Sequence, residues 1–138
     1  MCKLAIRGMS KFKVSDIEIG MPKPSYTINT LDRLKKDYPQ YNFTLIIGAD
    51  NYVQLPLWKE YKRLKEENKI LVYPRLFEKS IPNFKSKKGN EENVQFCDAP
   101  IIEISSTFIR SAIHKGKNIS SFLPKDVYSY IIQHTLYQ

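Results

Sequence analysis

Histidine and cysteine are scarce in this chain, which has two of each among its 138 residues. So few metal-binding side chains, spread along the sequence, argue against a zinc site. Cys2 and Cys97 form no recognisable disulfide framework, which favours a reducing, cytoplasmic setting. No apolar run approaches the roughly 20 residues of a membrane span, and residues 1–9 lack the apolar core of a signal peptide. We therefore expect a cytoplasmic protein with no membrane segment and no metal site built by the protein.

Positive charge is in excess, with 22 Lys and Arg against 14 Asp and Glu and a net charge of +8. That surplus favours anionic ligands such as phosphates, nucleotides or nucleic acid, but it does not choose among them. A solvated lysine surface is the more common meaning of such a number. With 42% hydrophobic and 26% charged residues, the composition is that of a globular protein, and the length fits one domain over residues 1–138.

Apolar periodicity alternates between the helical and the extended kind along the chain. Helices are expected over residues 1–9, 27–38 (capped by Ser25 or Thr27), 58–67, 106–115 and 124–136. Strands are expected over residues 12–19, 43–47 (covered on both faces), 69–73, 94–97 and 101–104, and a polar loop over residues 75–93. This alternation predicts an α/β fold of Rossmann-like class, a parallel sheet with helices on both faces.

Three polar segments lie at strand ends or helix starts, where parallel α/β sheets bind ligands. They are residues 25–30, 46–50 and 104–110. Each places hydroxyls, a carboxylate or a guanidinium near the free backbone amides of a helix start, which bind anions. Taken singly, each has a plainer interpretation, since Ser and Thr before a helix are usually caps and Gly48 is often only a turn.

Six sequence pieces, taken together and in order, are more specific. They are Pro24-Ser25-Tyr26-Thr27-x-x-Thr30-Leu31, Ile46-Ile47-Gly48-Ala49-Asp50, Leu55-Pro56-x-Trp58-Lys59, Val72-x-Pro74-Arg75, Ile104-Ser105-Ser106-Thr107-x-Ile109-Arg110 and Leu123-Pro124-x-x-Val127-x-x-Tyr130-Ile131. With these pieces the chain resembles the bacterial nicotinate-mononucleotide adenylyltransferases of the nucleotidyltransferase superfamily. The resemblance implies that ATP and nicotinate mononucleotide are the substrates and that nicotinate adenine dinucleotide and pyrophosphate are the products. It also implies Mg²⁺, which accompanies ATP and is held mostly by water and phosphate oxygens.

The resemblance also implies site residues. Thr27 and Trp58 match the nicotinate side of the family's pocket, where an indole stacks on the pyridine ring, and Asp50 matches the acid that faces ribose hydroxyls. The segment that binds the ATP phosphates and adenosine matches Ser105, Ser106 and Arg110. The alternative interpretation of Trp58 is a core or helix-start filler, and that of Arg110 is a solvated or ion-paired side chain.

The family's His-x-Gly-His loop is missing from this sequence. The only two histidines of this chain are His114 and His134, and both lie in expected C-terminal helices. By the resemblance, Met1 falls well inside the family's domain, so we expect an N-terminally truncated chain that lacks the first strand and the histidine loop and has impaired turnover. Loss of a central strand would expose a sheet edge, which favours self-association.

Two alternatives remain open. One is a noncatalytic basic module that binds nucleotides or nucleic acid through its charge and the lysines of residues 79–88. Nucleic-acid binding is the weaker part of this alternative, because most aromatic residues fall at core-like positions in the periodic pattern and are not free to stack on bases. The other is a different adenylyltransferase, such as the pantetheine-phosphate enzyme. The Ser25-Tyr26-Thr27 segment, with Trp58 eight residues after Asp50, argues instead for the pyridine-nucleotide enzymes.

Overall fold

The computed structural model describes residues 1–75 and 92–138. Within them the chain forms two compact units. One unit combines Met1–Ser15 with Ile104–Gln138, and the other is Asp16–Glu103. We call them the terminal unit and the sheet unit and describe each by itself. That the two make up one domain stays a prediction.

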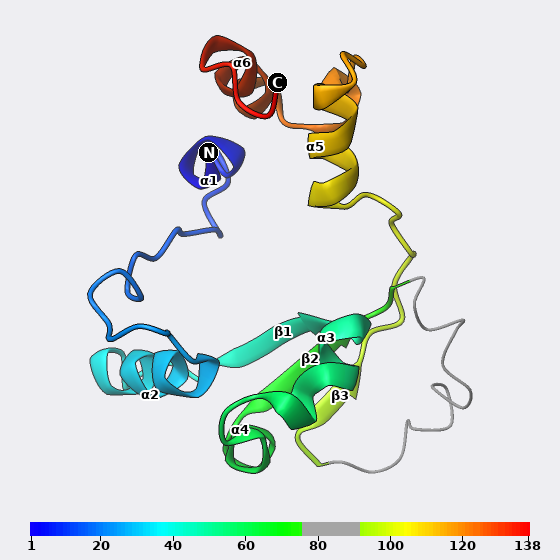
Figure 1. Cartoon of the computed structure of the whole chain (residues 1–138). Coiled ribbons are helices and arrows are strands. Elements are labelled where there is room, and N and C mark those ends of the chain that lie inside the picture. The colour runs from blue at the N-terminus through cyan, green and yellow to red at the C-terminus, as the bar shows by residue number, and fades with distance from the viewer. Residues whose placement is uncertain (76–91) are drawn as a thin grey trace. The chain divides into compact units, whose positions relative to one another are not determined.

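The sheet unit is built on three parallel strands (Figure 1). They are β1 (Thr44–Gly48), β2 (Lys69–Tyr73) and β3 (Val94–Phe96), in the order β1-β2-β3. Ile47 pairs with Val72, and Val72 in turn pairs with Phe96. The strands expected at 43–47, 69–73 and 94–97 are confirmed, and so is the α/β class with a parallel sheet.

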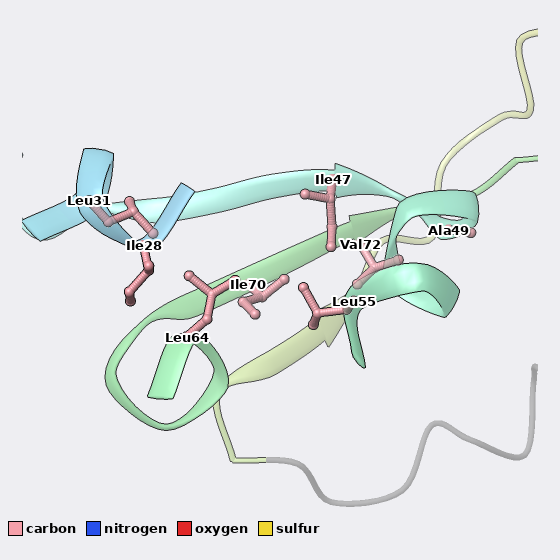
Figure 2. Close-up of a cluster of buried hydrophobic side chains, with 8 residues drawn as sticks. All are labelled: Ile28, Leu31, Ile47, Ala49, Leu55, Leu64, Ile70 and Val72. Carbon is pink, nitrogen blue, oxygen red and sulfur yellow. The ribbon is translucent and has the colours of Figure 1, made fainter. Parts of the chain in front are cut away.

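Helices of the sheet unit bury one face of this sheet. They are α2 (Thr27–Asp37), α3 (Ala49–Gln54), the 3₁₀ turn η1 (Leu55–Leu57) and α4 (Tyr61–Glu67). Side chains two apart on a strand share a face, which puts Ile70 and Val72 side by side under the helices. Figure 2 shows the resulting cluster, made of Ile28, Leu31, Ile47, Ala49, Leu55, Leu64, Ile70 and Val72.

Within the described residues of the sheet unit, no helix covers the opposite face of β1 at Ile46. Ile46, the neighbour of Ile47, points to that other face and has 66% of its surface exposed. The expectation that residues 43–47 are covered on both faces therefore stays a prediction. An almost wholly apolar run does not by itself reveal how many faces of a strand are covered.

Arg63 of α4 ties this helix to α2 by ion pairs. Its guanidinium donates to Asp32 of α2 at 2.8 Å and to Glu67 and Glu60 at 3.0 and 3.2 Å. The hydrogen bond with Glu67, followed by those with Asp32 and Glu60, raises the pKa of Arg63 above its ordinary value. Because all four side chains are partly exposed, solvent screens the pairs, and they fix orientation more than they add stability.

The terminal unit is helical. It contains α1 (Cys2–Ala5), α5 (Ser106–His114), η3 (Ser120–Phe122) and α6 (Lys125–Gln133). Its core is formed by Ile109, Ala112, Ile113, Ile119, Val127 and Ile131, with Leu4 and Ala5 of α1 packed against it. An ion pair of 2.7 Å between Arg7 and Asp126 joins the segment after α1 to α6. The two long C-terminal helices are confirmed, whereas the expected helix over residues 1–9 is only four residues long.

Two expected strands are absent from the described part of the chain. Residues 12–16 have no regular secondary structure and residues 17–19 form a turn, in which Ile19 N–H donates to the Asp16 carbonyl at 2.9 Å; Phe12 and Ile19 are 62% and 82% exposed. Residues 101–104 have no regular secondary structure and pair with no described strand, and Ile102 is 56% exposed. Alternating apolar residues need a neighbouring strand to become a sheet, and neither segment has one here. Most of the expected polar loop, residues 76–91, lies outside the described residues.

Candidate functional site

The carboxyl ends of β1 and β2 place three site residues together. Gly48 ends β1 and pairs with Tyr73, the last residue of β2. Asp50 is the second residue of α3, directly after Gly48, and Arg75 follows Tyr73 through the buried Pro74. This is the edge at which parallel sheets of this class bind their ligands. Gly48 is the N-cap of α3, so the chain turns there from β1 directly into the helix.

The Asp50 carboxylate lies against the backbone of Gly48. A Cβ atom added to Gly48 would overlap Asp50 Oδ1 and would lie 3.2 Å from Arg75 Nε. Arg75 Nε and Asp50 Oδ1 are 3.8 Å apart, close enough for an ion pair and too far for a hydrogen bond. Asp50 Oδ1 is buried and receives no hydrogen bond from any described residue. As whole side chains, Asp50 and Arg75 are each 44% exposed.

Helix α3 is held on the sheet by its own aromatic side chain. Tyr52 meets Phe96 of β3 edge to face, with ring centroids 5.2 Å apart. Ala49, between Gly48 and Asp50, is fully buried. These contacts fix the helix that carries Asp50, so the position of the carboxylate is set by the packing of α3 rather than by a mobile loop.

A second cluster joins the start of α2 to the segment after η1. The Lys59 ammonium lies over the Tyr26 ring, 4.7 Å from its centroid, and is 4.0 Å from a Glu60 carboxylate oxygen. Since Thr27 and Trp58 are the chain neighbours of Tyr26 and Lys59, this contact brings the two predicted nicotinate-side segments together. Among the described residues, no hydrogen bond, ion pair or ring contact joins Asp50 directly to Thr27 or Trp58.

The helix start expected at Trp58 and the helix cap expected at Ser25 or Thr27 are not found in the structure. Trp58 precedes α4 and ends η1, with its N–H donating to the Leu55 carbonyl at 2.9 Å, and its half-buried ring packs against the core cluster. Glu60, with φ of 52°, reverses the chain before α4 begins, which is why the helix expected from residue 58 starts at Tyr61. Thr27 is the first residue of α2, whose N-cap is Tyr26 and has no side-chain cap, so neither Ser25 nor Thr27 caps it.

The predicted ATP-binding residues belong to the terminal unit. Ser105 is the N-cap of α5, and its hydroxyl accepts a hydrogen bond from the Phe108 N–H at 3.1 Å. Ser106 is exposed at the first helical position. The exposed guanidinium of Arg110 donates to the Thr107 hydroxyl at 3.3 Å. The capping role of Ser105 is thus observed, and the helix holds the Arg110 side chain over its first turn.

The sequence-based assignment left Arg75, Tyr26 and Lys59 without a role. Arg75 and Tyr26 stand in the sequence pieces quoted above, and the useful signal was a cation two residues beyond the end of a buried strand. Lys59 has no such signal, because an exposed lysine is usually solvated. No group of three or more His, Cys, Asp or Glu that could hold a metal ion is found in residues 1–75 and 92–138.

A cavity of about 440 Å³ lies within the terminal unit. Its lining includes Ile113, His114, Lys117 and Tyr128, at the end of α5 and on α6. None of the predicted site residues lines it. No helix in the described part of the chain is long and apolar enough to cross a membrane.

Comparison with known proteins adds curated relatives of the whole chain. No family model matches it. It is 51% identical over 136 residues to a probable nicotinate-nucleotide adenylyltransferase of Bacteroides fragilis, covering 98% of this chain and 65% of that protein. It is 44% identical over 138 residues to one of Flavobacterium johnsoniae, covering 100% of this chain and 70% of the relative. The chain thus spans about two thirds of the length of these relatives.

Solved structures show the same fold. Nicotinic acid mononucleotide adenylyltransferase of Plasmodium falciparum, complexed with APC, superposes with a TM-score of 0.77 at 24% identity, covering 99% of this chain and 72% of that one. The same enzyme complexed with NaAD gives 0.75 at 23% identity, over 99% and 71% of the two chains. At this identity, the likeness supports the Rossmann-like fold assignment.

Proposed function

The chain belongs to the nicotinate-nucleotide adenylyltransferase family, and from this premise we propose that it acts in adenylyl transfer from ATP to nicotinate mononucleotide. The observation that carries the proposal is 44% identity over all 138 residues to a relative of that name. The Asp50 and Arg75 pair at the carboxyl edge of the sheet supports it, because such edges bind nucleotides in this class of fold.

The nicotinate side of the site is assigned to the sheet unit. Trp58 stacks on the pyridine ring, and Thr27 offers a hydroxyl and a backbone amide at the start of α2 for its carboxylate. Asp50 accepts hydrogen bonds from ribose hydroxyls. The Tyr26 and Lys59 contact supports this assignment, since it draws the segments of Thr27 and Trp58 toward each other.

The ATP side is assigned to the start of α5. Free amides of its first turn, the exposed Ser106 hydroxyl and the Arg110 guanidinium bind phosphate and adenosine. Ser105 is assigned there as well; its hydroxyl accepts from the Phe108 N–H and its carbonyl accepts from the Ile109 N–H. The nonhelical Ser105 backbone leads the chain into that first turn.

The reaction needs alignment and neutralisation of charge. An oxygen of the nicotinate mononucleotide phosphate attacks the α-phosphorus of ATP, that P–O bond forms, and the bond to pyrophosphate breaks. Mg²⁺, bound by phosphate oxygens and water, supplies charge neutralisation. The chain's own side chains bind and orient the two nucleotides. We also propose a cytoplasmic setting, in keeping with the free thiols of Cys2 and Cys97.

Self-association through β1 is a further part of the proposal. Among the described strands, β1 pairs with β2 alone, so its other edge has backbone groups without a strand partner in residues 1–75 and 92–138. Edges of this kind pair with other chains. Sedimentation velocity tests this: a concentration-dependent dimer is expected, and a monomer at every concentration contradicts it.

The proposed function is tested by product analysis with the 138-residue chain. ATP and Mg²⁺ are supplied with nicotinate mononucleotide or with phosphopantetheine, and the adenylylated product is identified by mass. We expect nicotinate adenine dinucleotide and no adenylylated pantetheine. Preference for phosphopantetheine, or no dinucleotide on prolonged incubation, contradicts the proposal.

A further inference from the structure

Asp50 presents two different oxygens. Oδ1 is buried on Gly48 and receives no hydrogen bond from any described residue. The side chain as a whole is 44% exposed, so its exposed area belongs to the remaining atoms, of which Oδ2 is the polar one. One oxygen therefore faces the protein, and the other is available to a ligand.

The only charged group that the structure places against the buried oxygen, within the described residues, is Arg75. Its Nε is 3.8 Å from Oδ1. Its side chain also crosses Gly48, with Nε at 3.2 Å and Cγ at 3.4 Å from the point where a Cβ would stand. Pro74, directly before Arg75, is buried and has a restricted φ, which limits the chain at the point where it leads into this side chain.

A buried carboxylate oxygen without a hydrogen bond is costly unless a cation compensates it. A guanidinium is well suited to this, because its charge persists at any working pH and its donors have fixed directions. Holding Oδ1 in this way limits rotation of the carboxylate, and Oδ2 keeps its direction. Without Arg75, either oxygen could turn toward water.

We propose that Arg75 is a positioning residue, which holds the Asp50 carboxylate on Gly48 so that its second oxygen accepts hydrogen bonds from the ribose of the pyridine nucleotide. This inference rests on the proposed function, since it requires a ribose-bearing substrate at Asp50. Arg75 acts through Asp50 in this account and does not contact the ligand's phosphate.

The test is a double-mutant cycle in the 138-residue chain, with binding measured by calorimetry. The variants are Arg75→Gln, Asp50→Asn and the double variant, and the ligands are nicotinate mononucleotide and nicotinic acid riboside, which lacks the phosphate. Arg75→Gln is expected to weaken both ligands about tenfold, by the same factor, as for the loss of one hydrogen bond to a charged group. The double variant should bind no more weakly than Asp50→Asn alone.

Arg33→Gln is the matched control. Arg33 also pairs with a carboxylate, that of Asp37 at 2.6 Å, but on the exposed surface of α2. Its loss should leave both affinities unchanged, and melting curves of all variants show whether folding is intact.

The possible outcomes separate the two proposals. Losses that add in the double variant, or a loss confined to the phosphorylated ligand, show that Arg75 contacts the substrate itself and overturn the positioning role. An unchanged affinity in Arg75→Gln overturns it as well. If the wild-type chain binds neither ligand, the proposed function fails and the inference fails with it.

Discussion

Substitution of Gly48 by alanine tests the site without removing any charged or polar group. Gly48 has φ of −73° and ψ of 157°, an ordinary extended conformation that alanine adopts without strain. The replacement also reduces the conformational freedom of the unfolded chain, which by itself stabilises a protein by about 0.4–1 kcal/mol. The backbone thus gives no reason for glycine at this position.

The reason lies in the side chains above it. The new methyl group would overlap Asp50 Oδ1 and would meet Arg75 Nε and Cγ at 3.2 and 3.4 Å. Overpacking in a closed core costs roughly 1–3 kcal/mol. Here both neighbours are partly exposed side chains that move aside, so we expect the lower end of that range. Offset by the backbone term, the free energy of unfolding should change by no more than about 1 kcal/mol.

Ligand binding should respond much more strongly than stability. Moving aside takes the Asp50 carboxylate away from its position, and a lost hydrogen bond to a charged group lowers affinity roughly tenfold or more. The assays are urea denaturation and calorimetric titration with nicotinate mononucleotide. Gly20→Ala is the control, because no atom lies within 4 Å of its added Cβ. Unchanged affinity in Gly48→Ala, or a stability loss above about 3 kcal/mol, would refute the reasoning.

Three further substitutions test other parts of the account. Trp58→Ala should weaken nicotinate mononucleotide by about 1–3 kcal/mol, measured by calorimetry, and ATP much less, because only the pyridine ring stacks on it; equal losses would mean a folding role, which its packing on the core allows. Arg110→Lys should weaken ATP in the same assay and change the free energy of unfolding by less than about 0.5 kcal/mol, since the side chain is exposed; unchanged ATP affinity removes it from the site. Leu64→Ala, at a fully buried position, should lower the free energy of unfolding by about 3–5 kcal/mol in urea denaturation, whereas Leu57→Ala, at a position 85% exposed, should lower it by less than about 0.5 kcal/mol. Similar losses for the two would contradict the placement of Leu64 in the core.

The regular core was predictable because its signals are local. Apolar runs at 43–47 and 69–73 became β1 and β2, and the periodic spacing of Ile28 and Leu31 became the buried side of α2. These residues report burial directly, since each buried position repeats at the period of its element. The elements and their parallel pairing followed from that pattern.

What the sequence did not reveal depends on partners distant along the chain. Residues 12–19 alternate like a strand, yet no strand pairs with them in the described structure, and Ile19 is left 82% exposed. Ile46 differs from Ile47 only in the face that it points to, and coverage of that face is a tertiary property. Apolar alternation is a necessary condition for a half-buried strand and not a sufficient one.

The candidate site shows the same division. Asp50 at the end of β1 could be picked out from the sequence, because a carboxylate after a buried strand and a glycine is a local feature. Its contact with Arg75, 25 residues further on, depends on the parallel register of Gly48 with Tyr73. The approach of Lys59 to Tyr26 likewise depends on how α2 and η1 pack on the sheet. Such pairings are set by the fold, and residue type alone does not predict them.

The most direct test of the central claim is a calorimetric titration of the wild-type 138-residue chain with nicotinate mononucleotide at two salt concentrations, 50 and 200 mM being about the range over which nucleic-acid binding changes most clearly. The account predicts saturation at one ligand per chain with an affinity that changes little with salt, and an affinity roughly tenfold or more weaker in Asp50→Asn. Absence of saturable binding, together with tight, steeply salt-dependent binding of single-stranded DNA through the +8 charge, would contradict it and favour a basic nucleic-acid-binding module.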